Sequence, residues 1–266
     1  MSDTITILGT RGSLPMCGGR FIEYGGLTTC VLVHMGGQYL VLDAGTGIMD
    51  LPEEAMRQTE LPLVLTHTHV DHLMGMPMCP YVMRKGSRLD IYGRTRAGLT
   101  VRQQVDRLLS PPLWPVTADD FLTELRFHEL PETLTFGSLR VDTMEGVHSG
   151  GVSLVRLEAE GKRVVFATDC TLNDEMWKKL GEFARDCDLL LVDGQYTDEE
   201  WPSRATFGHS TWRMAAEFAR SCGAKRLRVT HHDPQHTDTM LKPYDAELQA
   251  SNPAYRFARE GERIEL

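Results

Sequence analysis

The amino-acid sequence predicts an α/β protein in which helices cover the faces of sheets, and three observations support this class. Short apolar runs typical of strands recur along the 266 residues. Longer stretches with helical spacing lie between some of these runs. No low-complexity segment and no linker rich in Gly, Pro and Ser interrupts the chain. We therefore expect a single domain over residues 1–266.

The expected strands fall into two groups, one on each side of the middle of the chain. Turn signals at Gly36-Gly37 and Glu160-Gly161 separate some of them and indicate hairpins. The runs are Ile5–Leu8, Thr28–His34, Tyr39–Asp43, Leu61–Thr66, Leu89–Tyr92, Leu122–Glu129, Leu139–Met144, Val152–Ala159, Arg163–Thr168, Leu189–Asp193, Arg226–Thr230 and Tyr255–Ala258. Two sheet-and-helix halves that face each other would bring the strand ends to one edge.

Three helices are expected between these strands. The first covers Thr95–Leu109. The second covers Asn173–Ala184, with Asn173 as its N-terminal cap, because an Asn side chain accepts hydrogen bonds from free backbone N–H groups. The third covers Ser210–Cys222, capped by Ser210 and ended by Gly223.

Composition and charge narrow the class of partner. The chain is 41% hydrophobic and 24% charged, and its net charge is −9. This balance disfavours long nucleic acid, because phosphate binding favours a basic surface. No apolar run has the length of a membrane span, so we expect no membrane partner. The N-terminus lacks the basic region of a signal peptide, and the six cysteines are scattered, which together predict a cytoplasmic protein with reduced thiols.

The most informative segment is Thr66-His67-Thr68-His69-Val70-Asp71-His72, which follows an apolar strand. His67 and His69 alternate, so both side chains leave the same face of an extended segment. Asp71 and His72 follow where the chain turns and can face a second point. Imidazole and carboxylate donors suit Zn²⁺, Mn²⁺ or Fe. A lone histidine at a strand end is more often a hydrogen-bonded rim residue, but this density of ligands predicts one loop serving two metal ions.

Four more residues with metal-binding side chains follow apolar strands. His148 lies in a loop whose glycines allow close backbone approach. Asp169, Asp193 and His231 each end a strand-like run. Each of them alone is equally consistent with a turn residue or a helix cap. The four together strengthen the prediction of a metal site made from the histidine segment.

In this order of residues the chain resembles the metallo-β-lactamase superfamily. The motif His67-Thr68-His69-Val70-Asp71-His72 is followed by an isolated His, a strand-ending Asp and a strand-ending His. Asp43-Ala44-Gly45 also matches an Asp-containing turn of that superfamily. Gly208-His209-Ser210-Thr211 is similar to its phosphodiesterase branch, which includes tRNA 3′-processing endonucleases and cyclic-nucleotide phosphodiesterases.

The resemblance implies a four-layer αββα sandwich with a dinuclear site at one edge. It implies two divalent metal ions, with Zn²⁺ favoured over Mn²⁺ or Fe. His67, His69, His148 and Asp169 would hold one ion. Asp71, His72, Asp169 and His231 would hold the other. Asp169 would bridge, and His231 fits better than His232 because it directly follows the strand. A homodimer is also consistent with such relatives.

The reaction expected from this resemblance is attack by metal-activated hydroxide on a small phosphodiester, such as a cyclic nucleotide. Asp71 would orient or deprotonate the attacking water. His209 would protonate the leaving alkoxide, and Asp193 would orient His209, in a place where the related nucleases typically have Glu. The alternatives are a tRNA 3′-end endoribonuclease, a thioester, lactam or lactone hydrolase, and a non-catalytic metal-binding module.

Three further features carry weaker predictions. The basic residues between Arg84 and Arg107 are more typical of a solvated face than of a phosphate-binding surface. The methionines that follow the histidine loop are more typical of core packing than of a substrate pocket. Trp114 lies in a proline-rich loop, where stacking on a substrate ring is the less favoured interpretation.

Overall fold

The fold consists of two seven-stranded mixed sheets, and the structure, a computed structural model, describes residues 2–266. The first sheet contains, in spatial order, β14 (Arg263–Glu265), β1 (Thr4–Gly9), β2 (Cys30–Met35), β3 (Gln38–Leu42), β4 (Glu60–Val64), β5 (Arg88–Gly93) and β6 (Glu124–Glu129). The second contains β13 (Tyr255–Phe257), β12 (Leu227–Thr230), β11 (Leu189–Asp193), β10 (Lys162–Ala167), β9 (Val152–Ala159), β8 (Leu139–Gly146) and β7 (Thr133–Phe136). Each sheet is thus built from one half of the chain, except that β14 crosses to pair with β1.

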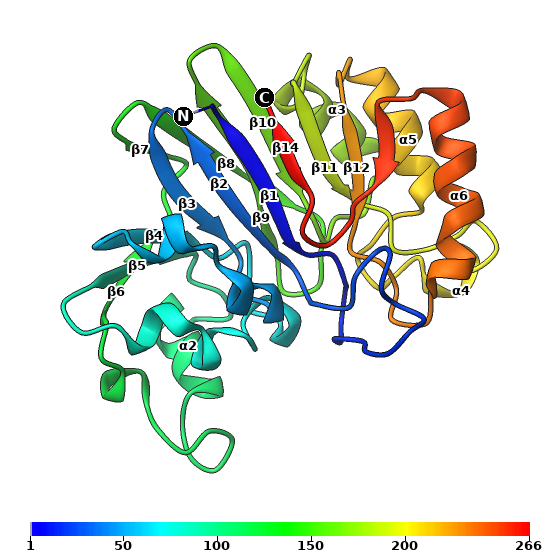
Figure 1. Cartoon of the computed structure of the whole chain (residues 1–266). Helices are drawn as coiled ribbons and strands as arrows, with labels where there is room; N and C mark the ends of the chain where they lie inside the picture. The colour runs from blue at the N-terminus through cyan, green and yellow to red at the C-terminus, as the bar shows by residue number, and fades with distance from the viewer. Residues whose placement is uncertain (1) are drawn as a thin grey trace.

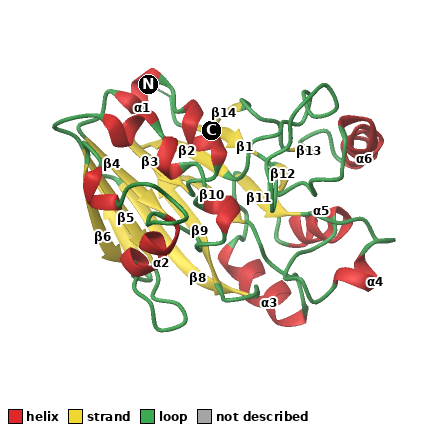
Figure 2. Ribbon diagram, turned by 90° about the horizontal axis from the view of Figure 1, so that it is seen from below, coloured by secondary structure: helices red, strands yellow, loops and turns green. Residues whose placement is uncertain are grey.

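Helices lie on the outer faces of both sheets (Figures 1 and 2). The α-helices are α1 (Glu53–Met56), α2 (Val101–Leu108), α3 (Asp174–Phe183), α4 (Trp201–Arg204), α5 (Trp212–Ser221) and α6 (Asp238–Ser251). The 3₁₀ helices are η1 (Thr46–Asp50), η2 (Val70–His72), η3 (Met76–Met78), η4 (Pro80–Met83) and η5 (Ala118–Asp120). Among the described residues, none of these helices combines the length and the apolar character needed to span a bilayer.

Alternation of side chains along the strands produces the layers. In β11, Leu189 and Leu191 belong to the hydrophobic cluster between the two sheets. Leu190 and Val192, on the other face, pack with residues of α3 and α5. Successive side chains of a strand point to opposite faces, so a strand that is apolar throughout is covered on both sides. The predicted αββα sandwich is confirmed.

Parallel strands bring the functional loops to one edge of the molecule. β10, β11 and β12 run parallel to one another, as do β3, β4 and β5. The carboxyl ends of parallel strands share one edge of a sheet, where ligands bind in open α/β sheets. The segments carrying His67, Asp169 and His231 all leave from such ends.

Several expected elements differ in detail. Helix α2 begins at Val101 rather than at Thr95, because Arg96 and Leu99 close a turn through two backbone hydrogen bonds and Thr100 caps the helix. Asn173 caps α3 as predicted, with its side chain accepting from the backbone N–H of Met176. The predicted cap of α5 was wrong: Thr211, not Ser210, accepts the capping hydrogen bond.

Strands β7 and β14 and helix α6 had no sequence-based prediction. The two strands are short, and α6 contains Pro243, a residue that usually ends a helix because it lacks an N–H.

Candidate metal centre

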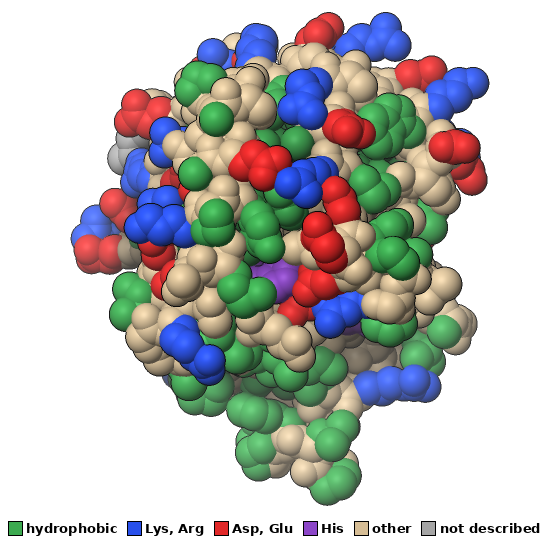
Figure 3. All heavy atoms as spheres, turned by 90° about the vertical axis from the view of Figure 1, so that its right-hand side faces the viewer, with side chains coloured by type: hydrophobic (Ala, Val, Ile, Leu, Met, Phe, Trp, Pro, Cys, Tyr) green, Lys and Arg blue, Asp and Glu red, His purple; other side chains and the backbone are tan. Residues whose placement is uncertain are grey.

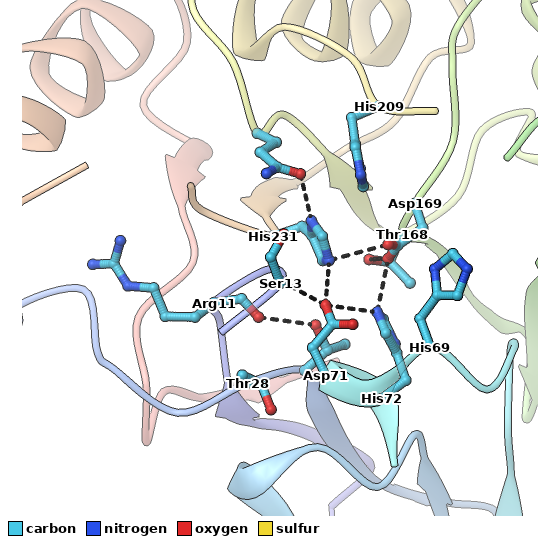
Figure 4. A network of polar contacts seen from close by, with 12 residues as sticks. Arg11, Ser13, Thr28, His69, Asp71, His72, Thr168, Asp169, His209 and His231 are labelled. Carbon is cyan, nitrogen blue, oxygen red and sulfur yellow. Dashed lines mark hydrogen bonds and ion pairs between the residues drawn. The ribbon is translucent and has the colours of Figure 1, made fainter. Parts of the chain in front are cut away.

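The structure brings every predicted site residue to one edge of the sandwich, although they come from loops far apart in sequence. Figure 4 shows Asp71, His72, Asp169 and His231 pointing toward one another, with His69 and His209 beside them. The side chains form overlapping clusters of groups that could hold a metal ion: His67, His69 and His148; Asp71, His72, Asp169 and His231; and Asp169, Asp193, His209 and His231.

The first cluster consists of three imidazoles whose nitrogens converge. His148 Nε2 lies 3.0 Å from His69 Nδ1, and its other ring nitrogen lies 2.9 Å from the carbonyl oxygen of Gly208. A carbonyl only accepts, so His148 Nδ1 carries the proton and Nε2 presents a lone pair. His67 Nε2 is buried without a hydrogen-bond partner among the described residues. An unpaired buried nitrogen aimed at two others is the arrangement that a metal ion satisfies.

The second cluster mixes carboxylates and imidazoles. Asp169 places one carboxylate oxygen 3.1 Å from His231 Nε2 and the other 3.1 Å from His72 Nε2. Asp71 Oδ2 lies 3.2 Å from His231 Nε2. Asp71 also accepts a hydrogen bond from the backbone N–H of Ser13 at 2.6 Å, which fixes the direction of its carboxylate.

Asp169 lies between the two clusters. Its Oδ1 is 3.9 Å from His67 Nε2 and 3.8 Å from His148 Nε2. Asp169 and His231 have φ angles of 53° and 63°. The left-handed conformation is uncommon for residues other than glycine and often occurs at functional sites. This conformation occurs just after the ends of β10 and β12 and turns both side chains into the shared space.

Burial and neighbouring charges give the two clusters opposite protonation. Burial, together with His72, holds the pKa of His67 well below its usual value, so this ring is neutral. In the second cluster burial opposes a charge on His231, but the carboxylates of Asp169 and Asp71 outweigh it and raise the pKa to about 10. Burial likewise opposes ionisation of Asp169, yet His231 and His72 hold the pKa of this carboxyl well below its usual value. The carboxylates of the second cluster thus favour positive charge beside them, which protons on the histidines or a bound cation would supply.

An outer ring of polar groups fixes the ligands, and the sequence indicates only part of it. Gln195 Oε1 lies 3.0 Å from His231 Nδ1, and Asp43 Oδ2 lies 2.9 Å from His72 Nδ1. Asp43 also accepts from the backbone and hydroxyl of Thr66. Such partners fix the tautomer and orientation of ligating histidines. Asp43 was visible in the Asp43-Ala44-Gly45 motif and Gly208 in the Gly208-His209-Ser210-Thr211 motif, but neither motif predicted the contact of Gly208 with His148. Gln195 followed from no pattern.

His232, the alternative to His231, faces away from the site. Its Nε2 donates to the carbonyl of Ala258 at 2.9 Å, and its ring packs near Phe257. His231 alone of the pair points into the cluster.

Asp193 and His209 form a hydrogen-bonded pair beside the second cluster. His209 Nδ1 lies 2.7 Å from Asp193 Oδ2, while Asp193 Oδ1 accepts from the backbone N–H of Ser210. The His209 ring stacks on His231 with ring centres 4.9 Å apart. Both oxygens of Asp193 are therefore committed to neighbouring groups, which favours an orienting role over metal binding.

The methionines and Trp114, which carried weaker predictions, lie elsewhere. Met76 is buried in the core, and Met78 and Met83 are exposed. Trp114 packs against the cluster between the first sheet and its helices. None of these side chains lines the cavity beside the histidines.

The geometry agrees with a match to a known family. Residues 39–232 match the family described as the β-lactamase superfamily domain, which covers more than half of the chain. The chain belongs to this superfamily. Its fold implies divalent metal ions, and the nitrogen and oxygen donors described above fit them.

Two relatives illustrate the range of similarity. Ribonuclease Z of Bradyrhizobium sp. (strain ORS 278) is 25% identical over 310 residues, covering 98% of each chain. Ribonuclease Z of Thermoplasma acidophilum is 37% identical over 87 residues, which are 33% of this chain and 27% of that relative. Over short segments of this kind, the match covers less than half of the length of each relative.

Solved structures share the fold along nearly the whole chain. The metallo-β-lactamase fold protein YhfI of Bacillus subtilis has a TM-score of 0.73 at 19% identity, covering 100% of both chains. A diphosphatase from the PhnP family has a TM-score of 0.71 at 18% identity, covering 99% of this chain and 98% of its own. The short form of human tRNase Z has a TM-score of 0.70 at 21% identity, covering 98% of both. The family match confirms the predicted superfamily, and these structures share its fold.

Proposed function

We propose that this protein is a dinuclear metal-dependent hydrolase of small phosphodiesters, of which a cyclic nucleotide is one example. The observation that carries the proposal is the pair of ligand clusters that share Asp169. His67, His69, His148 and Asp169 would hold one ion, and Asp71, His72, Asp169 and His231 the other. Zn²⁺ suits this set best, and Mn²⁺ and Fe are alternatives.

Two bound cations supply an activated water and neutralise the oxygens of a phosphodiester. The protein's own groups then orient the reaction. The Asp71 carboxylate, fixed by the Ser13 N–H, is placed to accept a proton from the attacking water. Burial opposes the charge of Asp71, but its contacts with His72 and His231 outweigh this, hold the pKa of the carboxyl well below its usual value and direct it into the site.

His209 is the proposed proton donor to the leaving oxygen. Asp193 accepts a hydrogen bond from the N–H of Nδ1, which leaves Nε2 to face the site. A carboxylate partner stabilises the protonated ring before it donates. Asp is shorter than Glu, but the 2.7 Å contact shows that its reach suffices for the hydrogen bond.

The arginines near the site favour a small substrate. Arg94 and Arg96 both pair with Glu145, and Arg102 pairs with Asp106 and Asp119. In Figure 3 the Lys and Arg side chains on one face are scattered among Asp and Glu side chains. A protein that follows a nucleic-acid backbone instead needs a continuous positive groove.

Hydrolysis of bis(p-nitrophenyl) phosphate by protein loaded with Zn²⁺ tests the proposal. The matched control is His67→Ala, which removes one proposed ligand. We expect turnover by the loaded protein and its loss in the variant, with metal content measured in parallel. Two bound metals without turnover would contradict the proposal.

A second candidate function is tRNA 3′-end endonuclease activity. The match to the Bradyrhizobium ribonuclease Z over 98% of both chains favours it. Cleavage of a precursor tRNA by the same loaded protein is the direct assay. Efficient cleavage there, with slow hydrolysis of small diesters, would make RNA the substrate.

A further inference from the structure

A cavity of about 400 Å³ opens directly beside the first ligand cluster. His67 and His69 form part of its wall, so a group bound there is continuous with the proposed metal centre. The opposite wall comes from the turn at residues 96–99, from α2 and from the loop that follows it. This volume lies in the range of small-molecule sites.

The wall of the cavity is mainly aliphatic. Its larger apolar side chains are Val70, Leu73, Leu99, Leu108 and Leu113. Leu113 is 71% exposed and Val70 is 55% exposed, both at the rim. Apolar side chains gathered around a concave site mark a place for an apolar ligand.

Gln104 and Arg96, two polar side chains of the same wall, are held by other groups of the protein. Gln104 donates to the carbonyls of Arg94 and Leu99 and accepts from the hydroxyl of Thr68. Arg96 is held by Glu145 at 2.6 Å and by Ser153 at 3.2 Å. These groups therefore shape the cavity and have little capacity left for a ligand.

Arg107 is the exception. It lines the cavity and is exposed, and no carboxylate lies within 4.0 Å of it in the part of the chain that the structure describes. Its neighbour Asp106 pairs with Arg102 instead. The cavity thus combines an apolar wall with one uncompensated positive charge.

We infer that this cavity binds the apolar ester group that stays on the phosphorus, while Arg107 attracts the negative charge of the same molecule. The inference rests on the proposed function. His209, the proposed donor to the leaving oxygen, is not among the residues that line the cavity. The leaving group and the group in the cavity are therefore different substituents. The substrate class is a diester that carries one aromatic or aliphatic group.

Two diesters with the same leaving group test the apolar part. Bis(p-nitrophenyl) phosphate and methyl p-nitrophenyl phosphate both release p-nitrophenolate, and they differ only in the retained group. In Leu113→Ser we expect the ratio of kcat/KM for the aryl over the methyl diester to fall at least about threefold relative to wild type, because apolar contact with the retained ring is lost. Leu122→Ser, at a leucine that is 55% exposed and outside the cavity, should leave the ratio unchanged.

Binding of anilinonaphthalene sulfonate, an aromatic anion, gives a readout that needs no turnover. We expect Arg107→Gln and Leu113→Ser each to weaken binding several-fold at low salt. The control Lys85→Gln makes the same charge change outside the cavity. Circular dichroism checks that each variant is folded, since all the changed side chains are exposed.

The outcomes separate the two proposals. Hydrolysis with an unchanged substrate ratio in Leu113→Ser would overturn the cavity assignment and leave the proposed function intact. Failure of the wild-type protein to hydrolyse either diester would overturn the proposed function. In that case, equal probe binding by wild type and both cavity variants would overturn the cavity as well, and weakened binding would support a site for apolar anions.

Discussion

His209 is the residue whose role can be tested most directly. A p-nitrophenolate leaving group needs little protonation, whereas an alkoxide needs a proton as the bond breaks. We expect His209→Ala to lower kcat by about 10²- to 10⁴-fold for a diester with an alkoxide leaving group, and by much less for p-nitrophenyl esters. Rates with both classes, alongside metal content, are the measurement.

His128→Ala is the matched control, because His128 pairs with Asp90 on the first sheet away from the site. Equal losses for the two leaving groups in His209→Ala would argue against proton donation.

Gly208 is a backbone position that a side chain would disrupt. Its φ is 92°, and an added Cβ would lie 2.3 Å from His148 Nδ1. We expect Gly208→Ala to displace His148 and to weaken metal binding at the first cluster, as measured by metal titration.

Gly161→Ala separates strain from displacement, because Gly161 has a φ of 77° and open space around it. That control should lose about 1–2 kcal/mol of stability and keep its metal affinity. Unchanged metal affinity in both variants would remove Gly208 from the site.

At the scale of elements, Asp142 joins three strands of the second sheet. It accepts hydrogen bonds from Thr133 on β7, from Arg140 on β8 and from Arg156 on β9. Burial opposes its charge, but Arg140, Thr133 and Arg156 outweigh that and hold the pKa of Asp142 well below its usual value. We expect Asp142→Asn to lower the free energy of unfolding by about 1–3 kcal/mol at pH 7.

The pH dependence of this difference has a definite sign. A carboxyl whose pKa is lower in the folded state stabilises the fold above the unfolded pKa of about 3.9. The gap between wild type and Asp142→Asn should stay constant down to about pH 5 and shrink as the pH falls below about 4. Urea unfolding across this range is the measurement. Asp119→Asn, in an exposed ion pair with Arg102, should change stability by less than about 1 kcal/mol.

The elements show which signals the sequence carries. The twelve expected strands all occur. Strands such as β11 are buried and apolar throughout and are bounded by turns, which makes their pattern clear. Strand β14 is a three-residue segment whose pairing with β1 depends on tertiary contact rather than on its own pattern. Ser210 and Thr211 are adjacent hydroxyl residues, and only the backbone path decides which of them caps α5.

For the whole molecule, removal of metal should reduce stability. A cation that binds the folded state alone contributes about 4 kcal/mol at 1,000 times its Kd. We expect chelation to lower the Tm of the wild-type protein by several degrees, as measured by calorimetry. The Tm of His67→Ala should shift by less. Equal shifts in the two proteins would place the bound metal elsewhere.

The site is predictable from the sequence to the extent that its side chains follow strand ends. His67, Asp169 and His231 stand directly after apolar runs, so the fold alone places them at one edge. Gln195 and the carbonyl of Gly208 orient ligands across 36 and 60 residues of sequence. No local pattern encodes such contacts, since they exist only when the fold brings distant loops of the second sheet together.

The position of Asp169 has a consequence for how the site fills. One carboxylate serves both proposed ions, so occupancy of either position sets the geometry of the other. Thermodynamic linkage makes this coupling reciprocal: whatever factor the first ion applies to the affinity of the second, the second applies to the first. Titration should therefore show cooperative or anticooperative filling rather than two independent sites.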